Sequence, residues 1–265
     1  MKYIAKIVFV WFVVQQNKNF FQIYLTTDGS DDFSLTAPIE EASLASRKCF
    51  EGFEYVRWGT ESLREFLRGF FKPDVLNAFD SLKPLSYKVD LAQLCVLYIY
   101  GGWYADITSK IINPDIAKYS RDNTLLFFKD HGMSCPSFAG TSFDCAAAFL
   151  YASAGHPALL RCIEQIVLNV KNRYYGFTAM SPTGPRMFGR IIAGFDLGLV
   201  RQLGWLMPLT PGLKKTNLAY VAENGEILAW HKTAWHPRGG ADLGAMGLSK
   251  TNSYRQLWRD RDVYI

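Results

Sequence analysis

The sequence predicts an α/β protein in which a mostly parallel central sheet is flanked by helices. Apolar runs typical of strands alternate with segments typical of helices along the first half of the chain, and this alternation is characteristic of parallel sheets covered by helices. The 265 residues are 49% hydrophobic and 20% charged, so apolar material for a sizeable core is present. No internal repeat or clean linker divides the chain. We therefore expect a single domain over residues 1–265, with a helical annex beside the sheet.

The expected strands are short runs rich in β-branched and aromatic residues. They cover 4–14, 20–26, 53–58, 103–108 and 124–129. The first run resembles a secretion signal, but its apolar core over 7–14 is only eight residues long and no small-residue cleavage site follows it. Such a core is too short to span a bilayer. The sequence thus favours a first buried strand, with a truncated signal-anchor as the alternative.

Helices are expected between these strands and beyond them. Their ranges are 38–49, 60–71, 73–79, 88–100, 145–153 and 156–172, followed by a helix that begins at Pro185. Thr60 and Glu61 suit the start of the second helix, and Pro73 suits the first turn of the third. Residues 130–145 are punctuated by Gly, Ser and Pro and predict a loop near the site. Short strands and a Gly-rich loop are expected over 218–265.

Charge and cysteine content restrict the function classes. The net charge is +5, from 29 basic and 24 acidic residues. This favours mild attraction to anions, such as a nucleotide diphosphate or an anionic membrane surface, but does not support nucleic-acid binding. The five cysteines include no CxxC pair, so neither a zinc site nor a disulfide framework is indicated. A reducing compartment is the simplest explanation.

Residues 86–110 carry the strongest functional signal. The helix expected over 88–100 is apolar nearly all round, which predicts burial. Gly101 and Gly102 end it and permit a tight turn. A short apolar strand then places Asp106 at its far end, where open α/β sheets bind ligands. An unpaired buried carboxylate is costly, so Asp106 must meet a cation, a hydrogen-bond donor or water there.

Asp90 lies in the expected first turn of the same helix and has two open interpretations. In the first, the helix dipole stabilises the negative carboxylate near the N-terminus of the helix. Alternatively, it points into a polar pocket and accepts hydrogen bonds from hydroxyl groups of a ligand.

This region resembles the sugar-binding region of the DXD-containing glycosyltransferases of family 32, relatives of capsular-polysaccharide and mannosyl transferases. The resemblance consists of Asp90, the run LeuTyrIleTyrGlyGlyTrpTyr at 97–104, and Asp106. Segments 47–67 and 183–185 and the ending NSYRQLW...VY resemble further parts of that family. The resemblance implies a GT-A-like (Rossmann-like) fold and a hexosyltransferase that uses a nucleotide-sugar donor, with retention at the anomeric carbon. It also implies a UDP- or GDP-sugar donor, a glycan or lipid-linked saccharide acceptor, and a part in polysaccharide biosynthesis.

The same resemblance implies roles for individual residues. Asp106 and Asp90 are the expected catalytic residues. The expected donor-binding residues are Trp11, Asp90, Gly101, Gly102, Tyr104 and Asp106. A divalent cation, Mn²⁺ or Mg²⁺, would be held by Asp106 with a late histidine, His231 or else His236. The chain departs from the family at Thr108, which replaces the second acid, and at Gln93, which replaces an arginine. A catalytically weakened nucleotide-sugar or carbohydrate-binding module on the same fold is therefore the alternative function.

Other groups of residues are weaker candidates for a functional site. Asp28-Gly29-Ser30 could belong to an aspartate-based phosphatase, but that chemistry needs a second acid where Ser30 stands, so a polar turn is favoured. Asp130 follows an expected strand and is a secondary candidate for sugar contact. No P-loop is present and no GxGxxG follows a strand. The expected location is cytoplasmic, with peripheral association at the inner face of the membrane as an extension of it.

Overall fold

A nine-stranded mixed sheet forms the centre of the protein. The computed structural model describes residues 18–31, 34–120, 124–130, 143–209, 217–235 and 243–265. In this part of the chain the strand order is β2-β1-β3-β6-β5-β7-β8-β9-β4. The strands are β1 (Asn19–Ile23), β2 (Glu54–Trp58), β3 (Gly102–Ala105), β4 (Lys110–Ile111), β5 (Leu125–Asp130), β6 (Cys145–Ala152), β7 (Val200–Pro208), β8 (Leu218–Ala222) and β9 (Ile227–Trp230).

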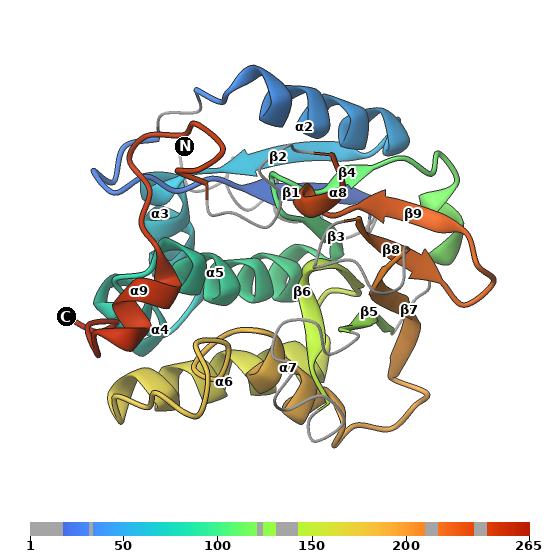
Figure 1. Ribbon diagram of the computed structural model, residues 1–265. Helices are drawn as coiled ribbons and strands as arrows, with labels where there is room; N and C mark the ends of the chain where they lie inside the picture. The colour runs from blue at the N-terminus through green and yellow to red at the C-terminus, as the bar shows by residue number, and fades with distance from the viewer. Residues whose placement is uncertain (1–17, 32–33, 121–123, 131–142, 210–216, 236–242) are drawn as a thin grey trace, which may run out of the picture.

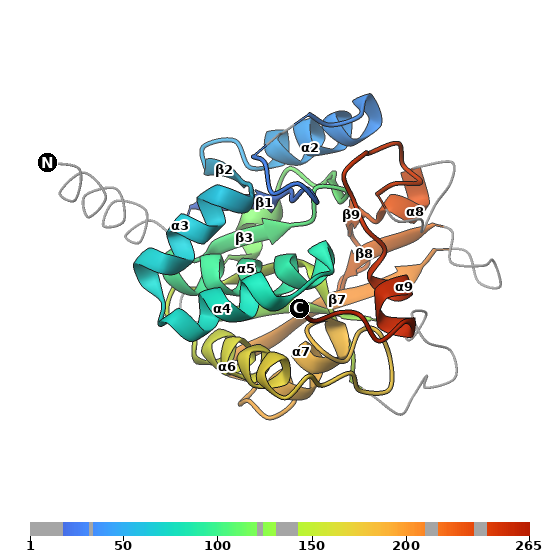
Figure 2. The same ribbon diagram turned by 90° about the vertical axis from the view of Figure 1, so that its left-hand side faces the viewer.

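The helices cover both faces of this sheet. They are α2 (Ala37–Cys49), α3 (Thr60–Phe70), α4 (Pro73–Ser81), α5 (Leu85–Tyr100), α6 (Pro157–Lys171), α7 (Pro185–Ile192), α8 (Lys232–Trp235) and α9 (Tyr254–Arg259), with a 3₁₀ turn, η1 (Ile116–Tyr119). Figure 1 shows α2 on one side of the sheet and α5, α6 and α7 on the other. Figure 2 shows α3, α4 and α5 side by side in front of the strands. No helix of the described residues has the length and hydropathy needed to cross a membrane.

The expectation of a mostly parallel sheet is wrong. Only β1–β2, β1–β3 and β5–β7 pair in parallel. The other neighbouring strands are antiparallel. β6 is antiparallel to both β3 and β5, and β7, β8, β9 and β4 form a series of antiparallel pairs. The sheet is therefore mixed, and its far edge strand β4 packs on α2, so the sheet curls.

The helix expected over 145–153 is also wrong, because this segment is strand β6. Its three consecutive alanines are good helix formers, but the strand lies in the middle of the sheet and is buried along almost its whole length. Pairing with two neighbours overrides the local preference. The other helices and strands expected between residues 20 and 129 are present, with ends that differ by a few residues. The first expected strand, 4–14, lies outside the described residues, as does nearly all of the expected loop at 130–145.

A glycine pair joins the most buried helix to a central strand. Gly101 caps α5 with φ 62° and donates its N–H to the Leu97 carbonyl. Gly102 has φ 111°, and a Cβ there would lie 2.5 Å from the Asn19 carbonyl oxygen. The Asn19 side chain donates to the carbonyls of Tyr100 and Gly101 at 3.1 and 3.3 Å. Only glycine fits this close approach, and it sends the chain from α5 directly into β3.

The strand directions bring the C-terminal ends of β3 and β5 to the same edge of the sheet. Strands β3 and β5 run the same way, with β6 antiparallel between them. Asp106, which follows β3, and Asp130, which ends β5, therefore lie at the same edge. The start of β6, at Ala146, Ala147 and Ala148, lies between them, and the carbonyl of Ala148 accepts the Asp106 N–H at 2.9 Å. Alanine side chains at this place leave space above the sheet.

Candidate functional site

A cavity of about 500 Å³ lies at this edge of the sheet. It is lined by residues from α5 and β5–β8, by Asp106 after β3, and by the segments 179–185, 231–233 and 253–255. The residues of chemical interest in its lining are Asp90, Asp106, Asp130, Tyr220, His231, Lys232, Tyr254 and Arg255. The location agrees with the ligand-binding edge that the sequence predicts for Asp106.

Asp106 is held in place by its own strand. The Tyr104 hydroxyl donates to Asp106 Oδ1 at 2.7 Å, because residues two apart on a strand point to the same side. Burial raises the pKa of Asp106, while the Tyr104 hydrogen bond and the positive charge of Lys232 oppose that rise. Tyr104 is fully buried and does not line the cavity. Its place in the structure is therefore that of a support behind Asp106.

Asp90 lies in the same cavity and shares it with Asp106. The Thr183 hydroxyl donates to Asp90 Oδ2 at 2.7 Å. The pKa of Asp90 is raised to about 7, mainly by burial; the Thr183 hydrogen bond lowers it, and the negative charge of Asp106 adds to the rise. The helix begins at Leu85, so Asp90 lies in its second turn, where the dipole effect has largely decayed. Of its two interpretations, the position in a polar pocket is the one that this geometry supports.

Tyr220, on β8, has a hydroxyl for which the described residues provide no hydrogen-bond partner. Its ring is fully buried and packs edge-on against Phe128 and Phe149. The Ser109 side chain lies near enough to lower the pKa of Tyr220 slightly, although the two groups do not form a hydrogen bond of good geometry. Burial raises the pKa of Tyr220, and the charges of Asp106 and Asp130 raise it further. The group is thus a neutral hydroxyl beside two carboxylates, and an orphaned buried hydroxyl calls for a ligand or a bound water.

His231 follows β9 and lines the cavity as a neutral ring. The Thr233 backbone N–H donates to His231 Nδ1 at 3.3 Å, so the neutral ring carries its proton on Nε2. Burial lowers the pKa of His231 to about 3, and the adjacent positive charge of Lys232 contributes. His231 therefore offers a hydrogen-bond donor to the cavity at neutral pH.

These side chains do not fit a divalent cation. Mg²⁺ and Mn²⁺ favour several oxygen ligands. Asp106 is the one strand-end acid beside β3, and one of its oxygens already accepts the Tyr104 bond. Thr108 is buried (5% exposed) and neutral, the Nε2 of His231 carries a proton, and Lys232 places a positive charge nearby. Among the described residues, no group of three or more His, Cys, Asp or Glu side chains is arranged to hold a metal ion.

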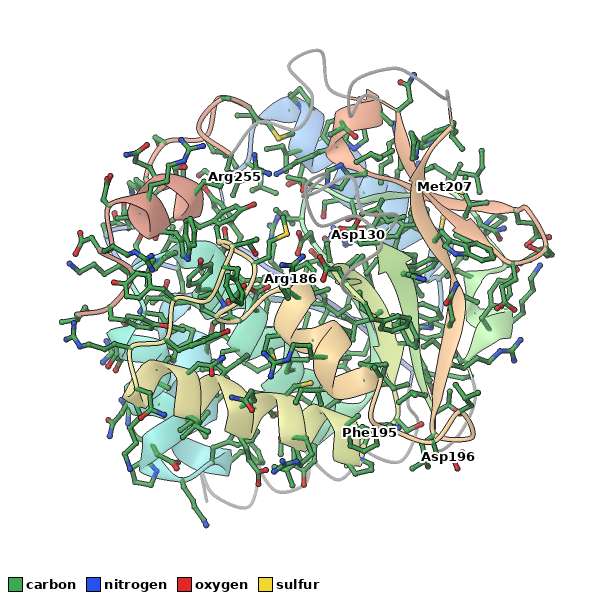
Figure 3. All side chains as sticks on the ribbon, turned by 60° about the horizontal axis from the view of Figure 1, so that its bottom comes forward. Asp130, Arg186, Phe195, Asp196, Met207 and Arg255 are labelled. Carbon is green, nitrogen blue, oxygen red and sulfur yellow. The ribbon has the colours of Figure 1, made fainter. Side chains whose placement is uncertain are left out.

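One wall of the cavity is built by the end of the chain. The Tyr87 hydroxyl donates to the Ala179 carbonyl, and the Tyr87 ring lies 6.1 Å from that of Tyr254. These contacts connect α5, the segment at 179 and α9. Figure 3 shows Arg255 at α9 and Asp130 near the middle of the same view, with Phe195 and Asp196 at the far end of it. Arg255 lines the cavity and is exposed, so it lies at the rim.

Several sequence candidates lie elsewhere. Gly101 and Gly102 are at the other end of β3 from Asp106 and do not line the cavity. Gln93 is buried (1% exposed) within α5. Asp28 accepts hydrogen bonds from Ser30 and pairs with Lys250 at 2.9 Å in a turn, which is the polar turn that the sequence favours over a phosphatase nucleophile. Trp11 and His236 lie outside the described residues.

The structure adds residues that the sequence does not single out as ligands. Tyr220, Lys232, Arg255 and Thr183 come from the last third of the chain. Lys232 adjoins His231, the expected metal ligand, and Thr183 opens the ThrGlyPro turn, so both positions have a weak signal nearby. Tyr220 stands in an ordinary apolar strand, and nothing in its neighbours distinguishes it.

Comparison with known proteins gives a short and a distant similarity. No family model matches the chain. The chain is 36% identical over 56 residues to "Uncharacterized glycosyltransferase L373" of Acanthamoeba polyphaga mimivirus, which is 21% of this chain and 22% of that protein. The chain thus matches about a fifth of the length of this curated relative. Among solved structures, a PaToxG glycosyltransferase superimposes with a TM-score of 0.48 and 12% identity, covering 72% of this chain and 78% of the other.

Proposed function

We propose that the chain is a glycosyltransferase that moves a sugar from a nucleotide-sugar donor to a glycan acceptor. The observation that carries the proposal is the meeting of Asp90 and Asp106 in one cavity at the ligand-binding edge of the sheet. Acidic oxygens that accept hydrogen bonds are the groups that hold sugar hydroxyls, and the orphaned Tyr220 hydroxyl provides a donor beside them. The 56-residue similarity to a protein named as a glycosyltransferase supports the same class.

In this proposal Asp90 and Asp106 bind hydroxyl groups of the donor sugar, and Tyr104 and Thr183 keep the two carboxylates in place. Asp130 at the end of β5 and Tyr220 on β8 contact the sugar or the acceptor. His231 donates a hydrogen bond from Nε2. The volume of about 500 Å³ lies within the range of ligand pockets, roughly 300–1,000 Å³.

The transfer breaks the bond between the anomeric carbon and the diphosphate oxygen, whose electron pair leaves with the nucleoside diphosphate. The acceptor hydroxyl oxygen forms the new bond to the anomeric carbon, and its proton passes to the departing diphosphate. The acceptor oxygen approaches from the face that the diphosphate leaves, so this route keeps the anomeric configuration, as the resemblance to family 32 implies. The protein aligns the two reactants, which by itself lowers the barrier substantially.

Release of the nucleoside diphosphate from a panel of UDP- and GDP-sugars tests the proposal. We expect one donor to be hydrolysed slowly without an acceptor and faster with a saccharide acceptor. Asp106→Asn should lose most of this turnover, whereas Asp28→Asn, a matched change in a turn outside the cavity, should keep it. Equal turnover by the wild type and the Asp106→Asn variant would contradict the assignment.

A binding module without catalysis is the second candidate. Thr108, which stands where the family has a second acid, is buried and does not line the cavity. The side chains that do line the cavity do not fit a metal, and this favours weakened chemistry. Calorimetric binding of a nucleotide sugar, with no turnover in the presence of saccharide acceptors, would select the module. The identity of the acceptor, a glycan or a lipid-linked saccharide, and work at the cytoplasmic face of a membrane are parts of the same proposal.

A further inference from the structure

The charged groups around the cavity present a problem for any phosphate-bearing ligand. Of the described residues in the lining, Asp90, Asp106 and Asp130 are acidic, and Lys232 and Arg255 are the permanently charged cations. A nucleoside diphosphate is itself anionic. Asp90 is about half protonated at neutral pH, because its pKa is about 7, but the remaining negative charge in the lining would still repel the diphosphate. Binding therefore requires a positive charge inside the same cavity.

Lys232 is placed to supply that charge. It directly follows His231 after the end of β9, and both residues line the cavity with Asp106. Its ammonium is near enough to lower the pKa of both Asp106 and His231. A divalent cation at Asp106 would have to sit against this positive charge, with one carboxylate oxygen already engaged by Tyr104.

Arg255 adds a second cation at the rim. Its Nε donates to the Tyr254 hydroxyl at 3.2 Å, and its guanidinium carbon lies 5.8 Å from the Tyr254 ring centroid. The Tyr254 ring is in turn packed near Tyr87 of α5. Arginine can bind two phosphate oxygens at once, whereas lysine acts as a point charge. The pair could therefore meet one phosphate inside the cavity and the next at its rim.

We infer that Lys232, assisted by Arg255, neutralises the diphosphate of the donor, so that the nucleotide binds without a divalent cation. This inference rests on the proposed function and deepens it, since it states which groups of this chain meet the leaving group. Developing negative charge on the departing diphosphate would be stabilised by two fixed side chains, which is the electrostatic role of cations in such transfers.

Thermal unfolding of the full chain with UDP and with GDP, in EDTA or in MnCl₂, tests the inference. Ligands that bind the folded state raise the apparent melting temperature by mass action. We expect one nucleotide to raise the melting temperature equally in EDTA and in Mn²⁺. Lys232→Gln should weaken the affinity by about tenfold or more, as loss of a charge-assisted hydrogen bond does. Lys232→Arg should retain most of it.

The matched control is Lys118→Gln, which removes an exposed lysine that pairs with Glu226 at 3.1 Å outside the cavity. It should leave the nucleotide shift unchanged. The melting temperature of each variant without nucleotide shows whether that variant folds. If Lys232→Gln does not fold, the Lys232→Arg variant still tests the inference. A shift that appears only with Mn²⁺, or one that persists in a folded Lys232→Gln variant, would overturn the inference and leave the proposed function standing. No shift with either nucleotide in any condition would overturn the proposed function together with the inference.

Discussion

The Thr183 hydroxyl donates a hydrogen bond to Asp90 Oδ2 at 2.7 Å and joins the turn before α7 to the second turn of α5. Thr183 is 1% exposed, whereas Asp90 lines the cavity, so the bond is shielded from water on the Thr183 side. It is the contact that places an otherwise unfavourable carboxylate inside the cavity. The ThrGlyPro turn thus acts on the site through Asp90, and the energetic consequences can be measured.

Replacing Asp90 by Asn should change how stability depends on pH. The pKa of Asp90 is about 7 in the folded protein, whereas an unperturbed aspartate has a pKa of 3.8. Between pH about 4 and about 7 the folded state therefore binds more protons than the unfolded state, and the free energy of unfolding falls as the pH rises through this window. Asn stays neutral and keeps an oxygen for Thr183. Asp90→Asn should match the wild type near pH 4 and be more stable than it at pH 8, by up to roughly 4 kcal/mol, since each tenfold change in proton affinity corresponds to about 1.4 kcal/mol.

Urea unfolding at pH 4.5, 6 and 8 measures this difference. Asp115→Asn, which alters an exposed acid beside η1, is the matched control and should show a difference from the wild type that does not vary with pH. A constant difference between Asp90→Asn and the wild type across the range would mean that Asp90 is solvated rather than enclosed.

Tyr220→Phe separates a ligand-binding hydroxyl from a structural one. The described residues leave this buried hydroxyl without a partner, so its removal should leave the free protein as stable as before or more stable by about 1 kcal/mol. Nucleotide-sugar affinity should fall severalfold at the same time. Differential scanning calorimetry and isothermal titration calorimetry give the two values.

The control is Tyr119→Phe, because the Tyr119 hydroxyl donates to Glu226 at 2.7 Å outside the cavity. That variant should lose a little stability and no affinity. Unchanged affinity in Tyr220→Phe would show that the hydroxyl contacts only water.

Gly102→Ala tests whether the glycine pair serves the fold rather than the ligand. A Cβ at residue 102 would lie 2.5 Å from a backbone oxygen, at a φ of 111°. We expect a loss of about 2–4 kcal/mol in the free energy of unfolding. Gly225→Ala has a similar φ of 87° with nothing within 4 Å and should lose only about 1 kcal/mol.

Chemical denaturation provides both values, and calorimetry of Gly102→Ala below its melting temperature should give the wild-type nucleotide affinity. If Gly102→Ala were no less stable than Gly225→Ala but bound ligand poorly, the glycine would have to be assigned to the donor site instead.

The central part of the site could be predicted from the sequence because its signal is local. An apolar helix, a glycine pair, a short strand and Asp106 follow one another within 86–110, and each step has its own residue pattern. β6 could not be predicted in this way. Its alanines favour a helix when read alone, and only the two flanking strands make it extended. The antiparallel β6 also explains why the sheet is mixed and why there is room above its start.

The remaining cavity residues depend on topology. Tyr220 and Lys232 follow Asp106 by more than 100 residues in the sequence, and they reach it because β7, β8 and β9 return the chain to the same edge of the sheet. An isolated tyrosine in a strand and a lysine after a histidine have no periodicity that marks them. Pairing order, which is a property of the whole sheet, decides their place.

Calorimetric titration of the best-bound nucleotide sugar and of its nucleoside diphosphate, into the wild type and into Asp90→Asn, tests the central claim most directly. In the proposed function the half-buried Asp90 and Asp106 hold the sugar while other groups hold the phosphates. We expect the wild type to bind the nucleotide sugar about tenfold more tightly than the diphosphate, and Asp90→Asn to remove this difference with little change in diphosphate affinity. An undiminished preference for the nucleotide sugar in a folded Asp90→Asn variant would contradict it.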